Sequence, residues 1–205
     1  MAKVKPPVYV PEFDPALHEY RWEGKIFIGA TTLLTKTGIR LVPSVDPVTL
    51  ELARVRGTIV HQATVGVDEG VAVPVDPAFA GYMQAYAMFC GTSTFLPVPD
   101  WTEQPLCDPA LGVAGTPDRV GYYGPHLKGA VLDIKTGEQE PSIGVQLAIY
   151  RHLLAVNGFP TVHRLSLHLR DDGTFRLYEY TDAGDHAAFL AALAIYRWRQ
   201  KAQAA

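Results

Sequence analysis

Residues 129–135 read Gly-Ala-Val-Leu-Asp-Ile-Lys, an apolar run that is broken by one carboxylate near its end. A short run of aliphatic residues without polar alternation is typical of a strand that is buried on both faces. An ionised Asp is costly to bury unless a cation or a metal ion partners it. The sequence therefore predicts a central strand here and marks Asp133 as a candidate functional residue.

Strand patterns bounded by turn residues recur on both sides of this run. Asp171-Asp-Gly173 favours a hairpin between the last two of these segments, and Glu23-Gly24 favours a hairpin within the first. The predicted strand segments are 20–28, 101–107, 113–123, 161–170 and 174–180.

Four segments have helical periodicity, and the first has a clear start, with Asp46 as N-cap and Pro47 at the first helical position. The predicted helices cover 48–67, 77–89, 141–157 and the region from about 183 onward. Helices and strands in this order predict an α/β fold with one central mixed β-sheet flanked by helices. We expect a single domain over 1–205, with a β-rich N-terminal extension over 1–45 and a catalytic core over 46–205.

The composition is that of an ordinary globular protein, with 48% hydrophobic and 19% charged residues. The net charge of −3 argues against a protein that coats DNA passively, because such binding depends on a large positive excess. Cys90 and Cys107 are too few for a disulfide framework, which favours a reducing compartment. Residues 1–7 contain no apolar segment of a secretory leader, and residues 187–196 are too short to span a bilayer. We expect a soluble cytoplasmic protein without membrane contact, in a bacterial or phage-infected cell.

Acidic and basic residues cluster between residues 115 and 136. Asp118 follows the turn Gly115-Thr-Pro, and Asp133 and Lys135 share one face of a strand because strand side chains alternate. Carboxylates are the ligands that Mg²⁺ prefers, and a lysine beside them can stabilise charge on a phosphate. The carbonyl of Ile134 would lie between Asp133 and Lys135 and could be a further ligand. This chemistry is that of metal-dependent phosphodiester hydrolysis.

In order and spacing, these motifs resemble the PD-(D/E)XK nuclease superfamily. Within it, the chain is similar to the RecB-like exonucleases, which include phage recombination exonucleases and the mitochondrial genome maintenance exonuclease. That group has a helical His, then Gly-x-x-Asp, Asp-x-Lys and Gln-x-x-x-Tyr. The matching residues here are His61, Asp118, Asp133, Lys135, Gln146 and Tyr150.

The resemblance implies a restriction-endonuclease-like core and an exonuclease that uses Mg²⁺ or Mn²⁺. It implies that Lys135 is catalytic and that the metal ligands are His61, Asp118, Asp133 and the Ile134 carbonyl, with Glu103 as a further acidic position. It also suggests a role in DNA recombination, repair or replication, and a single-strand annealing or binding protein as partner. The residues that we expect to contact DNA are Arg119, Thr136, Gln146 and Tyr150.

The chain departs from some relatives in one respect. Several RecB-like nucleases hold an iron–sulfur cluster with four cysteines, and this sequence has two, so no cluster held by four thiolates of one chain is expected. No Gly-x-x-x-x-Gly-Lys-Ser/Thr phosphate loop occurs either, which excludes a helicase motor of that type in this chain.

Each motif also has a simpler interpretation when it is considered alone. Asp118 suits a turn, His61 suits a helix packed against a sheet, and Gln146 with Tyr150 suits a hydrogen-bonded pair on a helix surface. Other functions stay open as well: an endonuclease of the same fold, a non-catalytic DNA-binding recombination accessory protein, and RNA as the substrate.

Overall fold

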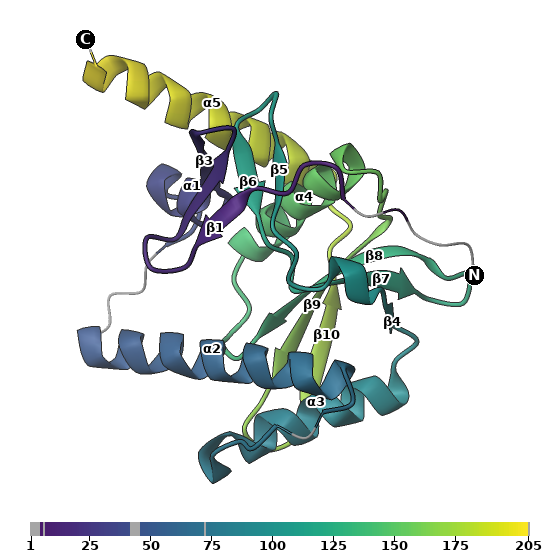
Figure 1. Cartoon of the computed structure of the whole chain (residues 1–205). Coiled ribbons are helices and arrows are strands. Elements are labelled where there is room, and N and C mark those ends of the chain that lie inside the picture. Colours follow the sequence, from purple (N-terminus) through teal and green to yellow (C-terminus); the bar gives the residue numbers. More distant parts are fainter. Residues whose placement is uncertain (1–4, 6, 42–45, 72, 205) are drawn as a thin grey trace.

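The computed structural model describes residues 5, 7–41, 46–71 and 73–204. These residues form two five-stranded mixed β-sheets and five α-helices (Figure 1). The predicted α/β class is confirmed, whereas the expectation of one central sheet is wrong. The prediction that residues 1–7 contain no secretory leader falls partly on residues 1–4 and 6, which lie outside the described residues.

The sheet that carries the apolar run has β8 at its centre, in the order β10-β9-β8-β7-β4. β8 pairs antiparallel with β7 and parallel with β9. Leu132 and Ile134 on β8 are completely buried, as are Ala130 and Val131. The prediction of a central strand is therefore confirmed. The strands of this sheet are β4 (Leu96–Pro97), β7 (Arg119–Tyr123), β8 (Lys128–Lys135), β9 (His163–Leu169) and β10 (Phe175–Glu179).

The other sheet has the order β1-β2-β3-β6-β5 and joins the N-terminal segment to the middle of the chain. The hairpin at Glu23-Gly24 is confirmed, since Trp22 pairs with Lys25 across it. β3 then pairs in parallel with β6. The strands of this sheet are β1 (Glu12–Asp14), β2 (Glu19–Trp22), β3 (Lys25–Gly29), β5 (Leu106–Asp108) and β6 (Val113–Gly115).

Two predicted strands differ in the structure. Residues 113–123 do not form one strand: the chain leaves β6 after Gly115, passes Pro117 and enters β7 of the other sheet. Proline has no N–H for a sheet ladder, which explains the break. Residues 101–107 are likewise mostly irregular, because a short 3₁₀ turn ends at Trp101 and β5 begins only after Pro105.

Four of the five α-helices lie where the sequence predicts them. The α2 helix begins as expected, with the Asp46 carboxylate accepting a hydrogen bond from Thr49 N at 2.9 Å. The unpredicted helix is α1, whose threonines favour strands and obscured its helical pattern. The helices are α1 (Ala30–Thr37), α2 (Pro47–Asp68), α3 (Ala80–Thr92), α4 (Ser142–Val156) and α5 (Gly184–Ala204), and the 3₁₀ turns are η1 (Pro77–Phe79) and η2 (Pro99–Trp101).

Helices cover both faces of the sheet that contains β8 (Figure 1). On one face, α2 and α3 contribute Val60, Tyr86 and Phe89 to a core with the even-numbered side chains of β8. On the other face, α1, α4 and α5 pack in a second core that includes Val131 of β8 and Val120 of β7. The alternation of side chains along β8 thus divides the hydrophobic core in two. Among the described helices, none is long and apolar enough to cross a membrane.

Two glycines of α3 allow a test of this packing. A Cβ at Gly81 would overlap the backbone carbonyl of Asp171, whereas a Cβ at Gly91 would meet no atom within 4 Å. We expect Gly81→Ala to lower the free energy of unfolding by about 1–3 kcal/mol, because the β9–β10 turn must move. Gly91→Ala should raise it by up to about 1 kcal/mol, since alanine is the better helix former. Urea denaturation measures both, and equal effects of the two variants would contradict the close contact.

Candidate active site

The site forms where β7 and β8 separate. Arg119 pairs with Leu132 across the two strands, so Asp118 and Asp133 are the next residues along them. The carboxylate of Asp118 turns back and accepts a hydrogen bond from Ile134 N, 2.5 Å from its Oδ2. The Asp118 carboxylate therefore takes the place of the backbone acceptor that a longer β7 would offer to the N–H of Ile134.

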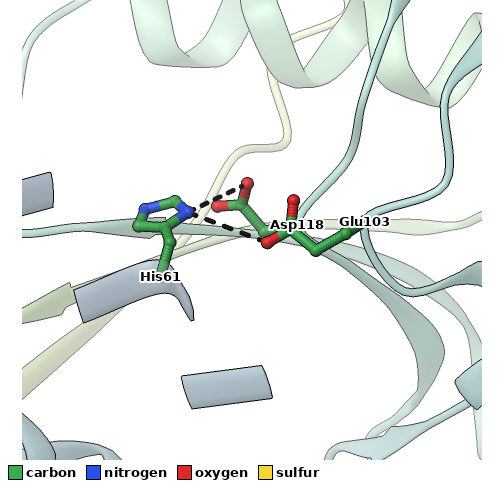
Figure 2. A group of neighbouring side chains, drawn as sticks. All are labelled: His61, Glu103 and Asp118. Carbon is green, nitrogen blue, oxygen red and sulfur yellow. Dashed lines mark ion pairs between the residues drawn. The ribbon is translucent and has the colours of Figure 1, made fainter. Parts of the chain in front are cut away.

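His61 reaches the same point from α2. Its Nε2 lies 2.8 Å from the carbonyl oxygen of Ile134. Its Nδ1 lies 3.4 Å from Asp118 Oδ1 and 3.9 Å from Glu103 Oε1 (Figure 2). One nitrogen and two carboxylates from three separate parts of the chain thus converge, and their ligand atoms lie within 4.8 Å of one another.

Asp133 and Lys135 form a second part of the site on β8. Lys135 Nζ lies 2.6 Å from Asp133 Oδ2, a close ion pair. The geometry is not that of a hydrogen bond, and the same Oδ2 is buried without a hydrogen-bond partner. Asp133 is only 2% exposed, so its carboxylate depends on nearby positive charge.

Helix α4 holds the lysine in place. Lys135 Nζ donates a hydrogen bond to Gln146 Oε1 at 3.3 Å, and Gln146 Nε2 in turn donates to Tyr150 Oη at 2.9 Å and to Thr31 Oγ1 at 3.3 Å. The ring of Tyr150 packs so closely on Gly115 that a Cβ there would lie 2.8 Å from the ring. The glycine of the Gly115-Thr-Pro-Asp118 turn is therefore required by the approach of α4.

The converging carboxylates change the pKa of His61. Burial lowers the pKa of its imidazole, but the charges and hydrogen-bonding oxygens of Asp118 and Glu103 outweigh this and raise it to about 11. For Asp118, burial raises the pKa of the carboxyl, and the proximity of His61 and Lys135 with the Ile134 N–H brings it below its ordinary value. The metal-free site therefore holds a proton on His61 between two carboxylates.

The Asp133–Lys135 pair responds differently. Burial raises the pKa of the Asp133 carboxyl, the positive charge of Lys135 lowers it, and the negative charge of Asp118 raises it again. The result is a pKa of about 6. Burial lowers the pKa of Lys135, but the carboxylates of Asp133 and Asp118 more than compensate and raise it. Lys135 is therefore a cation at neutral pH, suited to stabilising negative charge and unsuited to accepting a proton.

The residues expected to contact DNA differ in their exposure. Arg119 is completely buried and hydrogen-bonded inside the protein, so the prediction that it touches phosphate is wrong. Thr136 is half-buried at the end of β8 and accepts a hydrogen bond from Arg56 Nε at 3.4 Å. Gln146 is half-buried and Tyr150 is buried, and both are engaged in holding Lys135.

Three residues that contact the site are not among those predicted from the sequence. Thr64 and Asp68 lie on α2 one and two turns after His61, and both bind Arg119. Their spacing of three and seven residues from His61 is a helical signal that would have revealed them. Thr31 belongs to the unpredicted α1, and no pattern in the sequence connects it to Gln146.

The residues present fit a divalent cation. Oxygen ligands from Glu103 and Asp118 and a nitrogen from His61 suit Mg²⁺ or Mn²⁺. The buried Asp133 Oδ2, which has an ion pair with Lys135 but no hydrogen-bond partner, offers a further anionic oxygen close by. His61 would have to lose its proton to act as a ligand.

A larger opening lies elsewhere on the molecule. A cleft of about 620 Å³ is bounded by the β2–β3 hairpin, α1, the loop after β5 and α5. None of the candidate site residues lines this cleft, because His61, Glu103, Asp118, Asp133 and Lys135 lie near the ends of β7 and β8. The chemistry of the side chains, more than the depth of any pocket, identifies the site.

Comparisons with known proteins add little. No family model matches the chain, and no curated protein matches it. The matching solved structures include one titled "Crystal structure of SSO0001", which is 15% identical and covers 80% of each chain with a TM-score of 0.32. That similarity is too low to support an argument about fold or function.

The raised pKa of His61 predicts how cation binding depends on pH. Below that pKa, each bound ion must displace one proton, so the apparent affinity for Mn²⁺ should rise by about tenfold per pH unit between pH 6.5 and 8. Isothermal calorimetry in buffers of different ionisation enthalpy measures both the affinity and the released proton. His61→Gln should bind weakly and lose the pH dependence.

The matched control is His163→Gln, because His163 also pairs with a carboxylate, that of Glu179 at 2.6 Å, but away from the site. This variant should keep the wild-type dependence on pH. A wild-type affinity that is constant over this range would show that His61 is not a ligand.

Proposed function

We propose that this protein is a DNA nuclease of the PD-(D/E)XK superfamily with a restriction-endonuclease-like core, which uses Mg²⁺ or Mn²⁺ to hydrolyse phosphodiester bonds from DNA ends. The observation that carries the proposal is the meeting of Asp118, Asp133 and Lys135 beside His61. Simple DNA binding does not require several carboxylates beside a phosphate, because they repel it.

The metal would be held by His61, Glu103 and Asp118, with Asp133 close by. When bound, it supplies positive charge to the scissile phosphate and lowers the pKa of water. A mixed set of one imidazole and several carboxylates is compatible with both Mg²⁺ and Mn²⁺, and Mn²⁺ accepts the nitrogen ligand more readily.

Lys135 is the proposed catalytic residue of the protein itself. Its ammonium is fixed between Asp133 Oδ2 at 2.6 Å and Gln146 Oε1 at 3.3 Å. In this position it would orient the attacking water and stabilise the charge that develops on the phosphate as the water oxygen bonds to phosphorus and the P–O bond to the leaving group breaks. Gln146 and Tyr150 would act by keeping the lysine there.

Phosphate contacts would come from residues beside the site. Arg56 on α2 is half-buried, lies over Thr136 and carries a charge next to the end of β8. A guanidinium suits a phosphate because of its forked geometry. Contacts of this kind do not read bases, so binding should be largely independent of sequence. A single-strand annealing or binding protein would be the natural partner of such an enzyme.

Substitutions at the two ends of β8 test the proposed chemistry. Lys135→Met removes the proposed catalytic charge, and Lys128→Met removes an exposed lysine at the other end of the same strand. We expect Lys135→Met and Asp133→Asn to slow hydrolysis of DNA by at least about 100-fold, and Lys128→Met to leave the rate unchanged. Single-turnover assays with Mg²⁺ or Mn²⁺ measure these rates, and circular dichroism checks folding. A fully active, uncontaminated Lys135→Met variant would contradict the mechanism.

The choice of substrate tests the end-dependence. Linear single-strand and duplex DNA, labelled at either end, should be degraded while closed circles of both kinds survive. Cutting of circles would identify an endonuclease of the same fold. Wild-type protein that binds DNA but cuts none under either metal would favour a non-catalytic accessory protein, and selective loss of RNA would change the substrate class.

A further inference from the structure

A buried arginine lies directly behind the proposed metal ligands. Arg119 is completely buried, and its guanidinium is hydrogen-bonded on all sides. Its partners are Asp68 Oδ2 at 2.5 Å, Asp118 O at 2.8 Å, Thr64 Oγ1 at 3.0 Å and Glu103 Oε1 at 3.3 Å. The Tyr86 hydroxyl, whose single proton is shared between Asp68 Oδ1 at 2.8 Å and Oδ2 at 2.9 Å, fixes Asp68 in turn.

Glu103 is the residue that this network constrains. Its φ of 50° lies in the left-handed region, which is unfavourable for a residue with a Cβ and persists only where surrounding contacts enforce it. Its backbone N–H donates to Asp118 O at 3.2 Å. Glu103 Oε1 lies 3.3 Å from Arg119 and 3.9 Å from His61 Nδ1, between the buried cation and the proposed metal ligands. A side chain that is 35% exposed is thereby held inward.

The arrangement of the ligand atoms suggests how many ions the site takes. Among the described residues, the group of His, Cys, Asp and Glu side chains whose ligand atoms all lie within 4.8 Å of one another consists of His61, Glu103 and Asp118. The neighbouring carboxylate of Asp133 is already ion-paired with Lys135 at 2.6 Å. One compact group of three ligands suits one ion.

We propose that Arg119, anchored by Asp68, is a positioning residue that keeps Glu103 turned toward His61 and Asp118 and so builds a site for a single divalent ion. The inference rests on the metal site of the proposed nuclease. Arginine suits this task because its planar fork serves several acceptors at once, whereas lysine is a flexible point charge. Groups that hold metal ligands in place commonly change metal affinity by about 10- to 100-fold when they are substituted.

The test measures Mn²⁺ binding without DNA, by calorimetry and by electron paramagnetic resonance of free Mn²⁺. Wild type should bind one ion per chain. Arg119→Lys keeps the charge and loses the fork, and it should bind the ion about 10- to 100-fold more weakly. The matched control is Arg164→Lys, because Arg164 is also buried and paired with a carboxylate, Asp185, outside the site. Both lysine variants should lower the melting temperature, but only Arg119→Lys should change the affinity.

A double-mutant cycle shows whether Arg119 acts through Glu103. Glu103→Gln replaces a partly exposed side chain, so this variant should fold even if the arginine variants are unstable. It should weaken binding, and adding Arg119→Lys to it should cause little further loss, because the two residues form one unit. Fully additive losses would overturn the proposal, as would two ions per wild-type chain or equal affinities of the two lysine variants.

These measurements separate the inference from the nuclease function. A protein that binds one Mn²⁺ in this Arg119-dependent manner but cuts no nucleic acid would refute the proposed nuclease and support the role of Arg119. Metal-dependent cleavage together with an unchanged Mn²⁺ affinity in Arg119→Lys would support the proposed nuclease and refute the role of Arg119.

Discussion

The buried carboxylate of Asp133 at the end of β8 is the constraint on which the surrounding structure depends. Its neighbours along the strand are completely buried apolar residues, and it is itself 2% exposed. A charge in such a place requires a cation, which Lys135 provides two residues later on the same face. Lys135 in turn donates a hydrogen bond to Gln146, and Gln146 donates hydrogen bonds to Tyr150 and Thr31. A chain of polar contacts thus connects one buried charge to α4 and α1, which pack against the strand through their apolar residues.

The separation of β7 from β8 creates the space for this chemistry. If β7 continued backward past Arg119, the N–H and carbonyl of Ile134 would pair with its backbone. The chain instead turns at Pro117 toward the other sheet, and the Asp118 carboxylate and the His61 imidazole take those two hydrogen bonds. The same turn that divides residues 113–123 between two sheets thus delivers the functional side chains. The same side chains thus supply partners for the backbone groups of Ile134 and form the candidate active site.

Much of the fold follows from local sequence patterns, and the rest depends on contacts between distant residues. The apolar run of β8, the turn of the β9–β10 hairpin and the N-cap of α2 are encoded within a few residues, and each was predicted correctly. The division into two sheets was not, because the pairing of β3 with β6 joins residues far apart in the chain. α1 was missed for a different reason: its threonines favour strands, and only packing against α4 and α5 makes the helix stable.

The role of Arg119 could have been inferred from strand alternation. Adjacent residues on a strand point to opposite faces, so an arginine directly after an aspartate that faces the site must point away from it. In the structure it points toward α2 and α3, where Asp68 and Thr64 receive it. The position of Arg119 next to Asp118 in the sequence suggested a phosphate contact. The alternation of side chains along the strand indicates instead that Arg119 is buried on the opposite face. The same alternation places Asp133 and Lys135 together and sends Ile134 into the apolar core, so a single rule accounts for what each residue of the site can reach.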